Sequence, residues 1–327
     1  MPNGVKVPAN LMEAIQYFSD PLTCVQFFAG LRWENGEAVC PRCQSKRVSF
    51  LTTRIMWKCL DCKKQFSIKV GTIFEDSSLG LDKWLCAMFL IANCKNGVSS
   101  YEIARDLNIT QKSGWFMLQR IRHAMHTETF NKLSGQIEAD ETFVGGKARN
   151  MHPDKRAAKI TGRGPKDKAV VAGILERGGK VHAVVVPNRK KTALQSEIRE
   201  HVLAGSAIFT DALKSYEGLD EFQHEVVDHA VEYVRGEVHT NGMENFWSLL
   251  KRGLHGTYVS VEPFHLFRYL DEQTFRFNKR HTTDADRFGQ LCSSVVGKRF
   301  TWDQLTGKDD LIRPVRGEVN EPSTAGF

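Results

Sequence analysis

Three carboxylates in the second half of the chain stand in settings that suit metal chemistry. Asp140 lies in a run of alternating apolar and polar residues, Asp211 follows a short apolar run, and Glu244 lies near the start of an amphipathic stretch. Carboxylate oxygens are the ligands that Mg²⁺ and Mn²⁺ prefer, and two such ions held together catalyse phosphodiester cleavage. If the fold brings the three acids together, they predict a site for this chemistry.

The acid next to Asp140 is a rival ligand. Along an extended strand, side chains alternate between the two faces, so Glu138, Asp140 and Thr142 share one face and Glu141 lies on the other. Parity alone does not choose between Asp140 and Glu141, and the sequence leaves both open.

The other two acids also have purely structural interpretations. Asp211 suits a turn or a helix N-cap, and Glu244 completes a capping-box pattern that begins at Asn241. A rotation of about 100° per residue nevertheless groups Asn241, Glu244 and Lys251 on one polar side of the expected helix. Lys251, two turns after Glu244, is placed to neutralise a phosphate.

Four cysteines form a second chemical motif. Cys40 and Cys43 make one CxxC pair, Cys59 and Cys62 make another, and fifteen residues separate the pairs. This spacing is typical of a zinc ribbon, and in so small a unit the metal supplies much of the folding energy. A redox role is the alternative, but two pairs at this distance favour Zn²⁺.

Residues 81–126 predict three helices that suit DNA binding. An apolar helix over 81–92 is followed by a capping box from Ser99 to Glu102, a turn, and a longer helix that Thr110 caps. A short helix, a turn and a longer helix form the helix-turn-helix arrangement; three packed helices without a DNA role are the alternative. The side chains of the longer helix expected to face solvent or DNA are Gln111, Lys112, Gln119, Arg120 and Arg122.

From residue 136 onward the periodicity changes to strands. We expect three consecutive strands with a hairpin at Gly178-Gly179, followed by alternating helices and strands. That order is ribonuclease H-like, an α/β fold with a mixed sheet, although periodicity alone leaves it one of several α/β options. The expected strands cover 136–144, 170–176, 180–186, 207–210 and 225–234, and the expected helices cover 192–203, a stretch from about 241, and 262–277.

The charge is concentrated in two parts of the chain. The net charge is +7, and residues 1–135 carry 17 Lys and Arg against 11 Asp and Glu, a balance of +6, which suits a polyanionic partner. Residues 147–168, including Lys147 and Arg149, hold eight basic residues against two acids, so they predict either a solvated loop or one that contacts phosphates.

The organisation that follows has four parts. Apolar runs are too short for a membrane span, and no signal peptide is apparent, so we expect a cytoplasmic protein. The polar tail from Thr306 predicts partial disorder. The expected parts are N-terminal helices with a zinc ribbon (1–75), a helix-turn-helix domain (76–132), a ribonuclease H-like catalytic domain with a basic insertion (133–285), and a C-terminal extension (286–327).

In this order, the motifs CPRC, CLDC, IEADETFVGG, FTDA and HTNGMENFWSLLKR resemble those of ISXO-type bacterial insertion-sequence transposases, relatives of the Merlin superfamily of DNA transposons. The likeness covers roughly residues 11–280, and the motif from His239 to Arg252 is the most specific. It implies a ribonuclease H-like DDE transposase that uses Mg²⁺ or Mn²⁺ and acts on double-stranded DNA, as a homodimer or larger assembly, at the element's terminal inverted repeats.

The resemblance also assigns roles to residues. Asp140, Asp211 and Glu244 match the three acids, and Lys251 matches the basic residue after them. Asn241 and His239 are secondary candidates, for a ligand and for a phosphate or water contact. Two rival interpretations remain: a zinc-dependent transcription regulator, and a ribonuclease H-like nuclease or resolvase. The residues expected to contact DNA are completed by Lys147, Arg149, Lys251 and Arg252.

Overall fold

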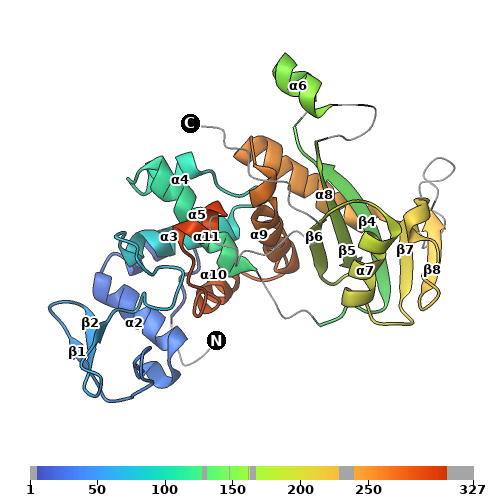
Figure 1. Ribbon diagram of the computed structural model, residues 1–327. Helices are drawn as coiled ribbons and strands as arrows, with labels where there is room; N and C mark the ends of the chain where they lie inside the picture. Colours follow the sequence, from blue (N-terminus) through green and yellow to red (C-terminus); the bar gives the residue numbers. More distant parts are fainter. Residues whose placement is uncertain are drawn as a thin grey trace. The chain divides into compact units, whose positions relative to one another are not determined.

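The computed structural model describes residues 6–126, 131–146, 148–160, 162, 167–227 and 239–307. These residues form two compact units (Figure 1). One unit contains the described residues up to His126 together with those from Lys279 onward, and the other contains the described residues between them. Within the described ranges, no helix has both the length and the apolar character needed to cross a membrane.

The first unit begins with two helices and a small sheet. Helices α1 (Leu11–Tyr17) and α2 (Pro21–Arg32) start at side-chain caps, and the short 3-10 helix η1 (Glu34–Gly36) follows. The sheet has the antiparallel order β1-β2-β3 and carries the two CxxC pairs at its ends. Its strands are β1 (Val48–Leu51), β2 (Met56–Cys59) and β3 (Gln65–Phe66).

Five further helices complete this unit. The predicted capping box at Ser99 and the predicted cap at Thr110 both form, and they begin α4 and α5. Two helices beyond residue 283 were not predicted from the sequence: α10, on which Phe288 stacks against Phe27 with ring centroids 6.0 Å apart, and α11. The helices are α3 (Leu81–Asn93), α4 (Ser100–Asp106), α5 (Gln111–Met125), α10 (Asp284–Ser293) and α11 (Trp302–Thr306).

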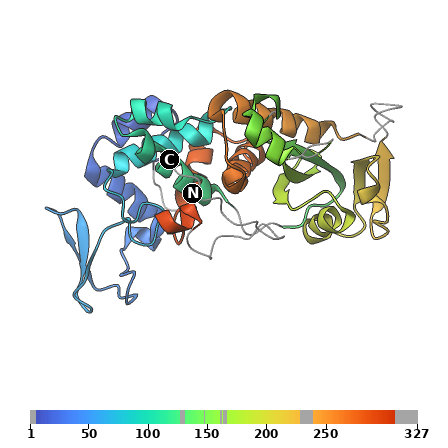
Figure 2. The same cartoon turned by 45° about the horizontal axis from the view of Figure 1, so that its top comes forward.

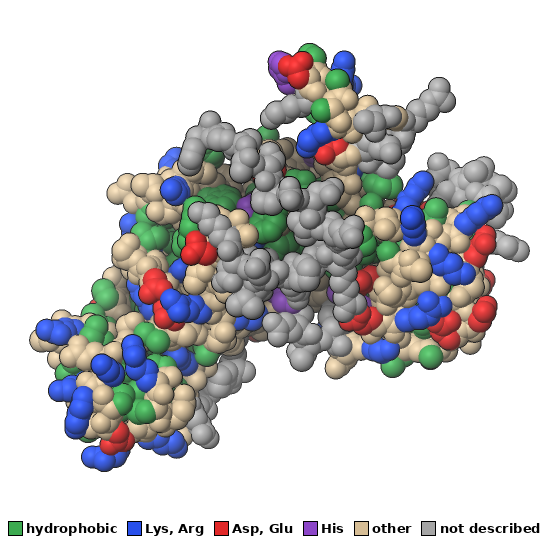
Figure 3. All heavy atoms as spheres, viewed as in Figure 1, with side chains coloured by type: hydrophobic (Ala, Val, Ile, Leu, Met, Phe, Trp, Pro, Cys, Tyr) green, Lys and Arg blue, Asp and Glu red, His purple; other side chains and the backbone are tan. Residues whose placement is uncertain are grey.

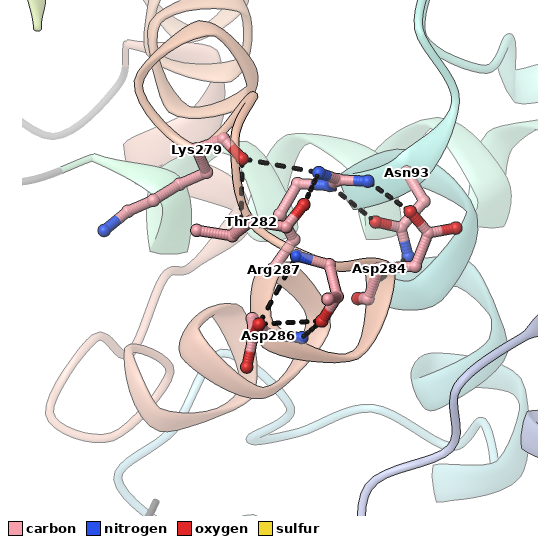
Figure 4. Close-up of polar contacts among 7 residues, drawn as sticks. Asn93, Lys279, Thr282, Asp284, Asp286 and Arg287 are labelled. Atoms are coloured by element: carbon pink, nitrogen blue, oxygen red, sulfur yellow. Dashed lines mark hydrogen bonds and ion pairs between the residues drawn. The ribbon is translucent and has the colours of Figure 1, made fainter. Parts of the chain in front are cut away.

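Arg287 anchors α10 to the rest of the unit (Figure 4). Its guanidinium donates hydrogen bonds to the side chain of Asn93 at the end of α3, at 2.9 Å, and to the backbone carbonyl of Thr282, at 2.6 Å. It also pairs with Asp284 in the first turn of α10. A single arginine therefore joins two helices that are far apart in the sequence.

The expectation that Gln119, Arg120 and Arg122 face solvent is wrong. These side chains are 0%, 4% and 1% exposed. The Arg120 guanidinium donates to the backbone carbonyls of Ile73 and Glu75 at 2.8 and 2.7 Å. Helix α5 is buried on more than one side, so a hydrophobic pattern that assumes one solvated face misplaces its polar residues.

The second unit is built on a five-stranded mixed sheet of order β6-β5-β4-β7-β8, consistent with a ribonuclease H-like core. β6, β5 and β4 are antiparallel neighbours, whereas β4, β7 and β8 run parallel. The strands are β4 (Gln136–Val144), β5 (Ala169–Glu176), β6 (Val181–Val186), β7 (Ala207–Asp211) and β8 (Gln223–Val227). The part of the expected last strand beyond residue 227 lies outside the described residues.

Helices cover both faces of this sheet (Figures 1 and 2). α7 and the 3-10 helix η3 pack on one face, and α8 and α9 pack on the other. α8 continues into a π-helical turn, η4, and α9 is preceded by a 3-10 turn, η5. Their bounds are α7 (Lys191–His201), η3 (Lys214–Tyr216), α8 (Asn241–Arg252), η4 (Gly253–Tyr258), η5 (Pro263–His265) and α9 (Leu266–Asn278).

The basic insertion contains local structure that the sequence did not predict. A 3-10 turn, η2 (Ala148–Asn150), is followed by the short helix α6 (Pro153–Lys159). Pro153 occupies the first turn of α6, where a residue without an amide hydrogen is tolerated.

Candidate active site and zinc centre

Three carboxylates converge in the second unit. One oxygen each from Asp140, Glu141 and Asp211 lies within 4.8 Å of the others. β4 and β7 are parallel neighbours, with Glu138 opposite Phe209. Asp140 and Glu141 lie two and three residues beyond this last pair on β4, and Asp211 lies two residues beyond it on β7, so the two strands bring their acids to the same place. The rival acids Asp140 and Glu141 therefore both take part in this cluster, which we call the carboxylate cluster.

Asp140 is held by two hydrogen bonds. The indole Nε1 of Trp247 on α8 donates to one carboxylate oxygen at 2.9 Å, and the amide of Glu141 donates to the other at 2.8 Å. Gly173 on β5 lies opposite Asp140, and a Cβ atom there would come 2.6 Å from the Trp247 ring. The absent side chain at Gly173 thus allows Trp247 to approach Asp140.

The other two acids have partners of their own. The hydroxyl of Tyr216, which is 2% exposed, donates to Glu141 at 2.9 Å. Asp211 accepts a hydrogen bond from the amide of Leu213 at 3.1 Å. Asp211 therefore makes the side-chain contact expected of a turn residue, and it also lies beside the other two acids.

The cluster concentrates negative charge in a half-buried place. Burial, together with the neighbouring carboxylates of Glu141 and Asp211, raises the pKa of Asp140 to about 7. Burial and the charge of Asp211 also raise the pKa of Glu141. A bound divalent cation would cancel this repulsion, so the oxygen-only donor set fits a hard ion such as Mg²⁺.

Helix α8 is capped from the sheet. Its N-cap residue, Thr240, makes no side-chain cap hydrogen bond, so the capping box considered for residues 241–244 does not begin this helix. Instead, the buried carboxylate of Glu138 accepts a hydrogen bond from the amide of Met243 at 2.9 Å. A Cβ atom at Gly242 would lie 2.8 Å from the same carboxylate, which explains the glycine in the motif.

His239 is tied to the same carboxylate through an arginine. Arg177 donates to Glu138 at 2.9 Å and to the backbone carbonyl of His239 at 2.7 Å. The Nδ1 atom of His239 lies 3.3 Å from Glu138. This network fixes the backbone that enters α8, which is a structural position for His239.

The remaining predicted residues differ in their exposure. Asn241 and Glu244 are exposed in the first turn of α8. Glu244 is not among the acids grouped within 4.8 Å, although Trp247 of the same helix reaches Asp140. Lys251 is half-buried near the end of α8. Among the DNA-contact predictions, Lys112, Arg149 and Arg252 are exposed and Gln111 is half-buried; Lys147 lies outside the described residues.

One basic group near the acids was missed from the sequence. The exposed Arg189, between β6 and α7, interacts electrostatically with Glu141, and its guanidinium lies 5.8 Å from the ring centre of Phe143. Lys190 and Lys191 follow it directly and are exposed. The run of three basic residues was the available signal, but only the fold shows that it lies beside the cluster.

The four predicted zinc ligands also come together. Cys40 and Cys62 have sulfur atoms 3.7 Å apart, and those of Cys43 and Cys59 are 3.5 Å apart. In a tetrahedral site with Zn–S bonds of about 2.3 Å, sulfur atoms lie about 3.8 Å apart, so the geometry fits zinc. None of these cysteines forms a disulfide.

The ribbon carries an exposed basic surface (Figure 3). Seven cationic side chains in and around its strands are exposed, against one exposed acid, Asp61. The sequence shows a positive net charge over residues 1–135 but does not single out any of these seven side chains. We define this basic ribbon surface by Arg42, Lys46, Arg47, Arg54, Lys58, Lys63 and Lys64.

A four-cysteine ribbon ahead of a mixed sheet with clustered acids is the architecture of a DDE transposase. Comparison with family models agrees: the ISXO2-like transposase domain matches residues 132–278, and the transposase zinc-ribbon domain matches residues 22–65. The chain belongs to the ISXO2-like DDE transposase family, with an N-terminal transposase zinc ribbon.

Two relatives are similar over much of their own length. A protein of Halobacterium salinarum, described as an uncharacterized protein in transposable element ISH50, is 28% identical over 257 residues, which are 74% of this chain and 86% of the relative. An uncharacterized transposase-like protein of Haemophilus influenzae is 38% identical over 101 residues, 30% of this chain and 81% of the relative.

Proposed function

We propose that this protein is the transposase of an insertion sequence. It binds the terminal inverted repeats of its own element, cleaves DNA at those ends and joins the 3′-hydroxyls to target DNA. The observation that carries the proposal is the convergence of Asp140, Glu141 and Asp211 from neighbouring parallel strands, in a chain whose family is one of transposases.

The acids supply the ligands, and their neighbours orient them. When bound, two Mg²⁺ or Mn²⁺ ions would activate the attacking water or 3′-hydroxyl and stabilise the leaving oxygen. Asp140 and Asp211 would hold them, and we assign Glu244 of α8 as the third acid. Trp247, one turn after Glu244, keeps Asp140 in place through its indole N–H.

Glu141 is the competing third ligand, and two substitutions separate the alternatives. With Glu244 as the ligand, Glu244→Gln abolishes strand transfer, whereas Glu141→Gln leaves measurable transfer. The opposite result would assign the role to Glu141, which already lies in the cluster and accepts a hydrogen bond from Tyr216.

Basic and polar side chains would hold the DNA. We propose that the basic ribbon surface and the pair α4–α5, acting as a helix-turn-helix, bind the inverted repeat, with Gln111 and Lys112 in the first turn of α5 at the bases. Lys251, Arg252 and the basic insertion would contact phosphates near the cut. Because two ends are processed together, we expect a homodimer or larger assembly on DNA.

The test is strand transfer with purified protein, a duplex carrying one end of the element, a supercoiled target plasmid and Mg²⁺. The wild-type protein joins the end to the plasmid. Asp140→Asn and Asp211→Asn lose joining but retain binding to the end, measured by fluorescence anisotropy. Cleavage without joining would instead indicate a nuclease or resolvase, and binding without either reaction would indicate a regulator.

A further inference from the structure

A second group of metal-binding side chains lies on the α7 face of the sheet. His182 is the second residue of β6, and Glu197 and His201 lie one turn apart on α7. One donor atom from each lies within 4.8 Å of the others. The group shares no residue with the carboxylate cluster or the ribbon.

The surrounding core fixes where these side chains point. Ile174 on β5 pairs with His182 across the sheet, and Ile174 belongs to the same buried core as Ile198, the residue after Glu197. The His182, Glu197 and His201 side chains are 22%, 14% and 16% exposed. They are therefore held by packing, with only a small part of each side chain exposed.

The Glu197 carboxylate lies near both imidazole rings. Glu197 Oε2 lies 3.9 Å from His182 Nε2 and 3.7 Å from His201 Nδ1, beyond the limit of about 3.2 Å for N–H···O hydrogen bonds. The two imidazole rings stack with centroids 3.8 Å apart at 18°.

The backbone also prepares one ligand. His201 Nδ1 lies 2.9 Å from the carbonyl oxygen of Glu197. When the proton is on Nδ1, this nitrogen donates to the carbonyl and Nε2 carries the lone pair. Metal-bound histidines usually have their second nitrogen held in this way.

We propose that His182, Glu197 and His201 bind a divalent transition metal ion of the Zn²⁺ class, with water completing the coordination. Two imidazoles and one carboxylate form a donor set that Zn²⁺ accepts. Because the two ring planes are nearly parallel and a bound ion must lie close to the plane of each imidazole that ligates it, one ring turns about its side-chain torsions when the ion binds.

The bound ion would link helix α7 to strand β6 at the edge of the sheet. The amide of Leu133 donates to the carbonyl of His201 at 2.7 Å, and the amide of Leu203 donates to Leu133 at 2.9 Å. Leu133 leads directly into β4, the strand of Asp140 and Glu141. A metal here joins the last turn of α7 to β6 beside the segment that enters β4, and it stabilises the folded state by mass action.

The first test is zinc content. Full-length wild-type protein, His182→Ala, Glu197→Gln and His201→Ala are equilibrated with Zn²⁺, and the bound metal is measured by mass spectrometry. We expect each variant to hold one zinc fewer per chain than wild type. The exposed His281 provides the control, because His281→Ala should keep the wild-type content. Zinc bound at other sites, such as the ribbon, is the same in wild type and in the variants, so it cancels when their zinc contents are subtracted.

The second test needs no variant. Crystals of the wild-type protein grown with Zn²⁺ should show an anomalous peak at the zinc edge between His182, Glu197 and His201. Equal zinc contents in folded wild-type and variant proteins, or the absence of that peak, would overturn the proposal. Neither measurement depends on strand transfer, so this result and the proposed function are judged separately.

Discussion

Trp247 and Tyr216 provide no metal ligand, yet each holds one acid of the carboxylate cluster through a single hydrogen bond. Asp140 thereby receives its direction from the indole on α8, and Glu141 receives its direction from the phenol of η3. Partners of this kind commonly change metal affinity or activity by about 10–100-fold when they are removed. Substitutions of Trp247 and Tyr216 therefore test Asp140 and Glu141 separately.

We expect Trp247→Phe to lower the rate of strand transfer by about 10-fold or more, since it keeps an aromatic ring but removes the N–H that holds Asp140. Tyr216→Phe, which removes the hydroxyl bonded to Glu141, is the matched comparison and should cost less. Both are measured under single-turnover conditions at saturating DNA. A Trp247→Phe protein as fast as wild type would contradict the role given to the indole.

The charge of Asp140 predicts a pH dependence. Its pKa is about 7 in the folded protein and about 3.9 in an unfolded chain. Well below pH 4 both states are protonated. Between about pH 4 and 7 the unfolded chain loses the proton first, so stability due to this group falls as pH rises.

Thermal unfolding without Mg²⁺ or Mn²⁺ checks this sign. Relative to Asp140→Asn, the wild-type melting temperature should fall from pH 4 to pH 7 and then level off. Added Mg²⁺ should raise the wild-type value more than that of the variant. A difference between the two proteins that does not change with pH would count against a raised pKa.

At the scale of elements, α8 depends on a strand for its start. Glu138 of β4 caps the first turn of α8, and Arg177 pairs with this carboxylate while holding the backbone at His239. Asp140 lies two residues after Glu138, so one strand positions both an acid of the carboxylate cluster and the helix that carries Glu244. Movement of β4 and α8 relative to each other is thereby restricted.

Glu138→Gln removes the charge from this network while conserving its shape. Breaking a buried ion pair costs about 3–5 kcal/mol, and we expect a loss near the lower end because Arg177 keeps some solvent contact. Urea unfolding measures the change. The exposed Glu225 on β8 provides the control, since Glu225→Gln should be neutral. Equal stabilities for the two variants would show that the network does not anchor α8.

Local sequence patterns predicted most of the helices and strands, but they predicted less about the burial and tertiary contacts of individual side chains. Alternation gave the bounds of β4 as 136–144, and the capping residues Ser99 and Thr110 gave the starts of two helices. These signals lie within a few residues of what they determine. The burial of Arg120 depends on carbonyls more than forty residues away, which no local pattern contains.

The site shows the same division. The sequence singled out Asp140 and Asp211, and it kept Glu141 as a rival, because acids within or directly after a strand-like run are a local signal. The part played by Trp247 arises from a tertiary contact that Gly173 permits. The sequence offered only its place beside the polar strip of α8.

At the scale of the whole molecule, charge is distributed by task. The basic ribbon surface carries seven exposed cations, whereas the carboxylate cluster gathers negative charge that metal ions must neutralise. For duplex DNA, the slope of log affinity against log salt becomes shallower by about 0.9 for every phosphate that a protein no longer neutralises. The change in this slope when ribbon cations are removed therefore measures how many DNA phosphates the basic ribbon surface contacts.

The triple variant Lys46→Ala, Lys58→Ala, Lys64→Ala should bind the element's end with a salt slope shallower by up to about three. Anisotropy titrations across a range of salt concentrations measure the slope, and an unchanged zinc content shows that the ribbon is still folded. Lys180→Ala, at an exposed lysine of the second unit, should leave the slope as it is. The same slope for the triple variant and wild type would exclude the ribbon from phosphate contact.

Helix α10 follows the second unit in the sequence but packs in the first unit, and this has a consequence for folding during translation. Phe288 is fully buried against Phe27 and Phe89, two residues that leave the ribosome much earlier. Domains generally fold as they emerge, starting from the N-terminus. Here the first unit can be completed only after the second unit has been translated, so a product terminated before residue 284 lacks a finished first unit.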